Sequence, residues 1–187
     1  MDTFECIATK FEVREFRTAQ KEEGEGEEYD VPSEIRLKVF EAARLTGTGL
    51  NTQHWRFILV ENKDNLKKIG EDSTSGSWVA GANFAIIVLT NPKYNFHLID
   101  AGRVVQNMQL TAWNDGIASG LFTGIREQKL RTDFAIPEEL SPTIIVGFGY
   151  PAEKLTGKGK KSKEKRKKNR LPLHELVYYE KYGNSKR

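Results

Sequence analysis

The sequence predicts a single α+β domain over residues 1–187. Residues 84–89 and 143–151 contain almost continuous apolar runs, which are typical of strands buried on both faces. Between them, residues 97–114 carry the longest helical pattern of the chain. A length of 187 residues suits one well-packed domain and is short for two. We therefore expect a central sheet flanked by helices.

Charge is unevenly distributed along the chain. The net charge is +3, but residues 19–30 form an acidic loop and residues 154–168 form a Lys-rich segment. Both compositions predict exposed, mobile segments. Because the positive charge is concentrated in one segment, a general nucleic-acid-binding surface is not expected.

The remaining composition points to the cytoplasm. No apolar run approaches the roughly 20 residues of a membrane helix, so no membrane partner is expected. The N-terminus lacks the order of a signal peptide. The chain has a single cysteine, Cys6, which rules out an internal disulfide.

The first helix is predicted within residues 4–16, where Phe4, Ile7 and Phe11 recur at helical spacing. If this helix continues, Lys10 and Arg14 share one face. Two cations on one face could bind a phosphate, or they could simply be solvated.

A second helix is predicted from Pro32 to Leu45, and a loop over Thr46–Asn51 ends it because two glycines favour a turn. This loop could present backbone N–H groups to a planar polar ligand, or it could merely connect two elements. A strand at 57–61, a helix at 64–70 and a loop at 72–77 then precede the central strand at 84–89.

The helix at 97–114 is apolar on more than one side, since Ile99 and Val104 lie off the stripe formed by Leu98, Ala101 and Val105. In a domain of this size, a dimer interface is the simplest reason. After it we expect a Gly-rich loop at 116–124, a short helix at 125–130 and the strand at 143–151.

The order of these motifs resembles that of the flavin-dependent nitroreductase family. The stretch Gly47–Trp55 is similar to the family pattern Pro-Ser-x-x-Asn-x-Gln-Pro-Trp, with Gly47 and His54 at the two proline positions. Residues 10–14, Lys-Phe-Glu-Val-Arg, resemble the family's Arg-x-Ser-x-Arg, with Glu12 at the serine position. Residues 149–151 and 168–170 resemble its terminal Gly-Tyr-Pro strand and C-terminal cations.

The resemblance implies a nitroreductase-like fold with a mostly antiparallel sheet, assembled as a domain-entwined homodimer. It implies FMN as cofactor, with NAD(P)H and a small nitroaromatic or quinone acceptor as ping-pong substrates. No catalytic side chain is implied, because the backbone near Thr123 and Gly124 faces the flavin N5. The implied cofactor-binding residues are Lys10, Phe11, Glu12, Arg14, Gly47, Thr48, Gly49, Asn51, Thr123, Gly124, Lys168 and Arg170.

Glu12 departs from the family pattern, since a carboxylate facing a phosphate is repulsive. We expect it to turn away or to pair with Lys10 or Arg14. His54, His97 and His174 lack metal-ligand spacing, so each is expected to be a satisfied or surface histidine, and no metal site is predicted.

One alternative belongs to a different functional class. A non-catalytic protein of the same fold could hold FMN poorly and use the Lys-rich segment to bind nucleic acid or an acidic partner. The colour of the purified protein separates the two, since bound oxidised flavin is yellow.

Overall fold

The computed structural model describes residues 1–17, 30–152 and 168–185. The chain divides at residue 153 into two units, each described by itself. The acidic loop predicted at 19–30 and the Lys-rich segment predicted at 154–168 lie outside the described residues, apart from Asp30 and Lys168.

The first unit is built on one antiparallel sheet. Its strand order is β1-β2-β4-β3, and every neighbouring pair is antiparallel. The central strand β2 is buried at every position, as its continuous apolar run predicts. The strands are β1 (Arg56–Val60), β2 (Phe84–Thr90), β3 (Ala118–Phe122) and β4 (Ser141–Gly149).

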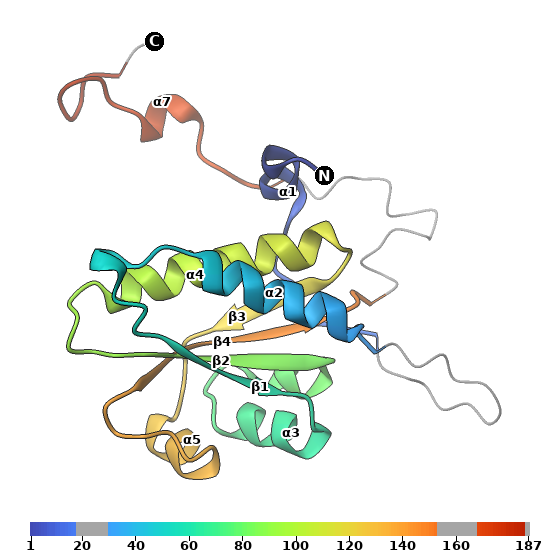
Figure 1. The fold of residues 1–187 in the computed structure, drawn as a ribbon. Coiled ribbons are helices and arrows are strands. Elements are labelled where there is room, and N and C mark those ends of the chain that lie inside the picture. Colours follow the sequence, from blue (N-terminus) through green and yellow to red (C-terminus); the bar gives the residue numbers. More distant parts are fainter. Residues whose placement is uncertain (18–29, 153–167, 186–187) are drawn as a thin grey trace. The chain divides into compact units, whose positions relative to one another are not determined.

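Helices cover both faces of this sheet (Figure 1). On one face lie α2 (Ser33–Leu45) and α4 (His97–Asn114), and on the other lie α3 (Lys63–Glu71) and α5 (Glu127–Asp133). The main core fills the layer under α2 and α4, where Val39, Met108 and Ile86 are fully buried. Burial of each such side chain stabilises the fold by about 1.5–3 kcal/mol.

The remaining elements are short. They are α1 (Thr3–Thr9), the 3-10 turns η1 (Gly49–Asn51) and η2 (Ser77–Gly81), and, in the second unit, α7 (Leu173–Leu176). None of the helices in the described ranges is long and apolar enough to cross a membrane.

Two expectations from the sequence are wrong. The first helix ends at Thr9, and residues from Lys10 onward are extended, so Lys10 and Arg14 do not share a helical face. The stretch at 116–124 is not one loop, because Ala118–Phe122 pair with β4 as the buried strand β3. In both cases, pairing with distant residues overrides the local pattern.

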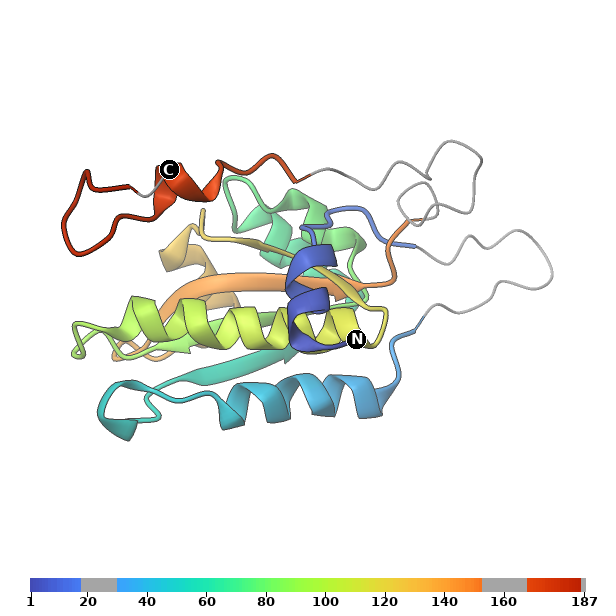
Figure 2. The same cartoon turned by 90° about the horizontal axis from the view of Figure 1, so that it is seen from above.

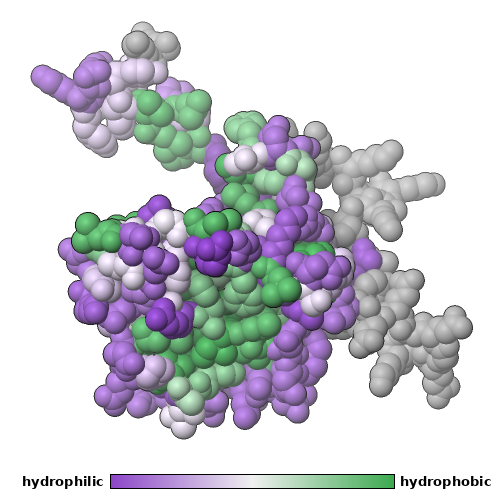
Figure 3. Space-filling model, viewed as in Figure 1, coloured by the Kyte–Doolittle hydropathy of each residue, from purple (hydrophilic) through white to green (hydrophobic). Residues whose placement is uncertain are grey.

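Part of the apolar surface of α4 stays uncovered in a single chain. Leu98 and Ile99 are 61% and 66% exposed, and Leu45 at the end of α2 is 68% exposed. Figure 3 shows further hydrophobic surface on the side where β1 and α2 face the viewer. Large exposed apolar residues close together are typical of an interaction surface.

Candidate functional site

The segment after α1 lies against β3. Glu12 forms a parallel bridge with Ser119, and the Val13 N–H donates to the Ser119 carbonyl at 2.9 Å. This close approach requires a glycine at 120, because a Cβ there would overlap the Val13 carbonyl oxygen. The extended segment thereby brings Lys10, Glu12 and Arg14 to the end of the sheet.

Lys10 forms a polar cluster with Glu12 and Gln109. Its ammonium group is ion-paired with the Glu12 carboxylate and donates to Gln109 Oε1 at 3.0 Å. The Gln109 amide in turn lies 3.4 Å from both Glu12 carboxylate oxygens. Glu12 therefore takes one of its two expected arrangements, the pair with Lys10.

Arg14 is exposed and lies over Trp78. Its guanidinium carbon is 5.9 Å from the centre of the Trp78 ring, a cation–π arrangement. Within the described ranges it has no carboxylate partner, so its N–H groups can bind an anion. The buried Trp78 Nε1 also has no hydrogen-bond partner among these residues.

The turn at Thr123 and Gly124 follows directly after β3. Phe122, the last residue of the strand, packs edge-on against Trp78 at 5.7 Å. The Gly124 carbonyl accepts the Thr74 N–H at 2.8 Å. A Cβ at Gly124 would overlap the Thr74 hydroxyl, so the residue type allows the two loops to approach. Trp78 thus joins Arg14 to the strand that ends in this turn.

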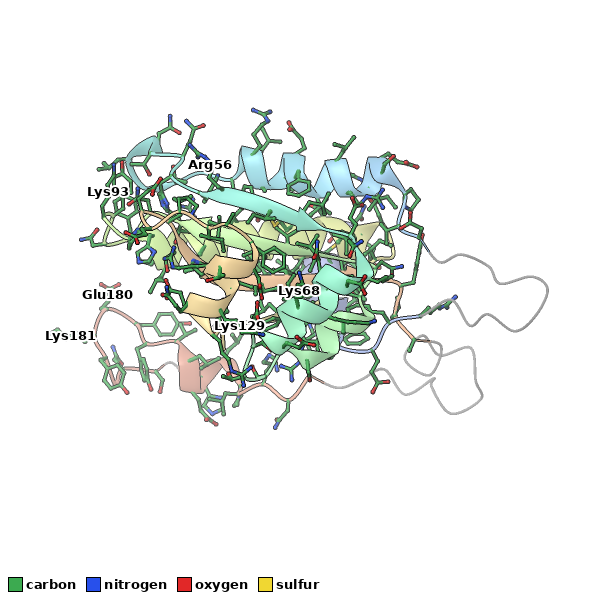
Figure 4. All side chains as sticks on the ribbon, turned by 90° about the horizontal axis from the view of Figure 1, so that it is seen from below. Arg56, Lys68, Lys93, Lys129, Glu180 and Lys181 are labelled. Carbon is green, nitrogen blue, oxygen red and sulfur yellow. The ribbon has the colours of Figure 1, made fainter. Side chains whose placement is uncertain are left out.

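A polar cluster between α3 and α5 holds the residues that follow this turn. The Arg126 backbone N–H donates to the Asp72 carbonyl at 2.7 Å, and its guanidinium donates to the carbonyls of Glu71 and Ser73. Lys129, on the side of α5 that faces α3 (Figure 4), lies 2.6 Å from the Asp72 carboxylate.

Asp72 is fully buried, and this burial raises the pKa of its carboxyl above the ordinary range, although the Lys129 ammonium opposes the shift. The hydrogen bond to Asp72 raises the pKa of Lys129. The sequence did not point to this cluster. Its only local signal is an acidic residue that opens a Ser/Thr/Gly loop.

The loop over Thr46–Asn51 is attached to the other end of α4. Asp100 Oδ2 accepts the Gly49 N–H at 2.9 Å and the His54 Nε2 hydrogen at 3.2 Å. Within the loop, Thr48 Oγ1 accepts the Gln53 N–H at 3.0 Å. Gly47 lines an open groove of about 650 Å³ between the end of α2 and α4.

The backbone of this loop is held in an unusual conformation. Leu50, Asn51 and Gln53 have φ values of 51°, 52° and 46°, in the left-handed region that favours glycine. Such conformations cost about 1–3 kcal/mol each and persist only where neighbouring contacts determine them. The bonds to Asp100 are such contacts, and they leave Asn51 exposed.

His54 is a buried, hydrogen-bonded histidine. Its Nδ1 accepts the Asn91 N–H at 3.3 Å, which places the ring hydrogen on Nε2, facing Asp100. Arg103 adds a third contact to the same carboxylate at 3.3 Å. Asp100 was not predicted, because its importance comes from contacts 46 and 51 residues away.

The predicted residues therefore fall into separate groups. Within the first unit, the Lys10 cluster lies near Gln109 and the Asn51 loop near Asp100, nine residues apart on α4, or about 13 Å along the helix axis. Figure 2 shows α1 and the η1 loop toward opposite ends of α4. Phe11 packs edge-on against Trp113 at 5.1 Å, so its ring has a packing role. Lys168 and Arg170 are exposed in the second unit.

Comparisons with known proteins identify this architecture. The nitroreductase family profile matches residues 73–150. A protein of Methanothermobacter thermautotrophicus, provisionally named an NADH dehydrogenase/NAD(P)H nitroreductase, is 30% identical over 162 residues, which cover 82% of this chain and 79% of the relative. The chain therefore belongs to the nitroreductase family.

Solved structures agree with this assignment. A nitroreductase family protein from Clostridium difficile 630 superposes with a TM-score of 0.76 at 26% identity, covering 97% of this chain and 99% of the other. An FMN-dependent nitroreductase from Clostridium difficile R20291 gives a TM-score of 0.77 at 18% identity, covering 96% and 100%. The α+β fold with an antiparallel sheet flanked by helices is the nitroreductase fold.

Proposed function

We propose that the protein is an FMN-dependent oxidoreductase that takes electrons from NAD(P)H and passes them to a small acceptor such as a nitroaromatic or a quinone. The observation that carries this proposal is the continuous path from Arg14 over Trp78 to the turn at Thr123 and Gly124. It offers a cation at one end and backbone amides at the other, beside the unpartnered Trp78 Nε1. Family membership supports the same cofactor.

The residues present fit FMN. Arg14 would hold the phosphate, because cationic side chains bind phosphate through strong charge-assisted hydrogen bonds. Lys10, Lys168 and Arg170 are the further cations that the family resemblance implies for this role. A backbone N–H at Thr123 or Gly124 would fix the N5 edge of the ring. Gly120 and Gly124 allow the Val13 backbone and the Thr74 loop to pack closely against β3 and this turn. FMN would supply the redox chemistry, accepting hydride and passing electrons on.

The second part of the proposal is a homodimer with the site at its interface. In one chain, the Lys10 cluster and the loop that carries Asn51 contact α4 nine residues apart, about 13 Å along the helix axis. A second copy could supply Asn51. The exposed Leu45, Leu98 and Ile99 support this, since a partner would remove their apolar surface from water. A stable FMN-loaded monomer in sedimentation would contradict it.

The proposal is tested by the colour and kinetics of the purified protein. We expect a yellow protein whose flavin absorbance is bleached by NAD(P)H without oxygen. Donor and acceptor would use the same open face in turn, giving parallel double-reciprocal lines. A colourless protein that cannot be reconstituted with FMN would favour the non-catalytic alternative.

A further inference from the structure

We infer that Glu12 sets the flavin specificity of this site by masking Lys10, so that the protein accepts flavins without a phosphate, such as riboflavin, nearly as well as FMN. This inference rests on the proposed function. It begins from the cluster of Lys10, Glu12 and Gln109, in which a carboxylate already occupies the cation that would bind a phosphate.

Glu12 is the more exposed member of the Lys10–Glu12 ion pair, so it lies between Lys10 and solvent. The Lys10 side chain is 10% exposed, whereas that of Glu12 is 45% exposed. Gln109, which accepts from Lys10 from the α4 side, is 1% exposed. The ammonium is thus enclosed by its two partners, and the more solvent-accessible of them is the anion. An incoming phosphate would meet the carboxylate and not the free ammonium.

The charge of this cluster affects FMN and riboflavin differently, because only FMN carries a phosphate on its ribityl chain. Lys10, Glu12 and Arg14 together carry a single net positive charge, and only Arg14 lacks an anionic partner in the described ranges. A phosphate monoester carries about two negative charges at neutral pH, so it is repelled by Glu12 while it is attracted by Arg14. The uncharged ribityl tail of riboflavin avoids this repulsion.

Glu12 also cannot easily swing away. Its backbone is bridged to Ser119, and its carboxylate is held by both Lys10 and the Gln109 amide. A phosphate that engages Lys10 must therefore replace the Lys10–Glu12 ion pair, which offsets part of the energy gained from the new contact. The same exchange is not required for a flavin without a phosphate.

The test is a titration of the full-length protein with FMN and with riboflavin, followed by quenching of flavin fluorescence. For the unmodified protein, we expect dissociation constants for the two flavins that agree within about threefold. Glu12→Gln keeps the shape and the hydrogen bond to Gln109 but removes the charge. It should bind FMN about tenfold more tightly, with riboflavin affinity unchanged.

Three further measurements make the result specific. Glu5→Gln, an exposed glutamate on α1, makes the same charge change and should leave both affinities unaltered. Glu12→Ser should reproduce the gain for FMN if Glu12→Gln folds poorly. Salt should weaken FMN binding more steeply in the Glu12 variants, because the net attraction is larger.

The possible failures are distinguishable. If Glu12→Gln binds FMN no better, or improves both flavins equally, the inference is overturned while the proposed cofactor stands. A strong preference of the unmodified protein for FMN over riboflavin would also overturn it. If neither the unmodified protein nor the Glu12→Gln variant binds FMN or riboflavin, the proposed function fails and the inference fails with it.

Discussion

The His54 Nε2 lies 3.2 Å from Asp100 Oδ2, and both side chains are only 2% exposed. The same carboxylate accepts the Gly49 N–H, so one buried side chain on α4 holds the loop at Gly49 and the residue that precedes Trp55. In the family pattern, prolines stiffen this loop, and here Gly47 and His54 occupy their positions. The structure replaces a covalent restraint with hydrogen bonds to a distant helix.

Asp100→Asn should therefore loosen the loop that carries Asn51. An amide cannot accept from His54, Gly49 and Arg103 as the carboxylate does, and a lost bond to a charged group costs about 1.5–3 kcal/mol. We expect FMN affinity to fall by about tenfold or more in a flavin titration. Asp115→Asn is the control, since Asp115 directly follows the same helix but pairs with Lys38. Equal effects of the two substitutions would contradict a positioning role for Asp100.

Asn51→Gly tests the side chain of the loop without disturbing its backbone. Glycine adopts the φ of 52° at this position freely, whereas alanine would add about 1 kcal/mol of strain. We expect weaker FMN binding, by about tenfold, at both sites of the proposed dimer. Leu50→Gly is matched, because Leu50 also has a left-handed φ of 51° but carries no polar group. If Leu50→Gly weakens binding as much, the asparagine amide is not the contact.

Asp72→Asn should change how stability depends on pH. Burial raises the pKa of the Asp72 carboxyl in the folded state, so the folded chain holds this proton more tightly than the unfolded chain. The stabilisation from that proton is complete below the unfolded pKa, near pH 4, and is lost as pH rises through the folded pKa. Asparagine keeps the uncharged state at every pH.

The measurement is thermal unfolding of both proteins between about pH 4 and pH 8. Relative to the variant, the unmodified protein should lose stability as the pH rises through this range. Lys129 does not complicate the comparison, because its raised pKa lies far above the range. Parallel stability curves for the two proteins would show that Asp72 is not the titrating group.

Arg170→Ala tests whether the second unit contributes to cofactor binding. If Arg170 binds the FMN phosphate, its loss should weaken FMN about ten- to a hundredfold, because the bond is charge-assisted. Riboflavin binding should not change. Lys181→Ala removes another exposed cation from the same unit and provides the control. If both substitutions leave FMN affinity nearly unchanged, Arg170 is a solvated surface cation and does not bind the phosphate.

Elements governed by burial were predictable from the sequence. Helix α4 begins at His97 and ends at Asn114, the predicted bounds, because its apolar positions follow a helical period. Strand β2 is fully buried, as a continuous apolar run requires. Helix α2 begins at Ser33, directly after the proline expected in its first turn.

Elements governed by distant partners were not predictable. Residues 10–16 are extended because they pair with β3 and with Pro151, more than 100 residues later in the chain. Strand β3 consists largely of small residues with weak strand propensity and is stabilised by its ladder with β4. For the same reason, local motifs predicted Arg14 and Asn51 as candidates but not Asp100 or Asp72.

Gly120→Ala should detach the segment that carries Lys10, Glu12 and Arg14. A Cβ at 120 would overlap the Val13 carbonyl oxygen, which is backbone and cannot rotate away, and it would approach the Trp78 ring at 3.0 Å. Overpacking of this kind costs about 1–3 kcal/mol, so the melting temperature should fall by several degrees. FMN affinity should fall further than stability alone explains, because Arg14 leaves its position over Trp78. Gly81→Ala is the matched control, since a Cβ there meets nothing within 4 Å. If Gly120→Ala melts early but binds FMN normally once folded, the segment beside β3 is not part of the cofactor site.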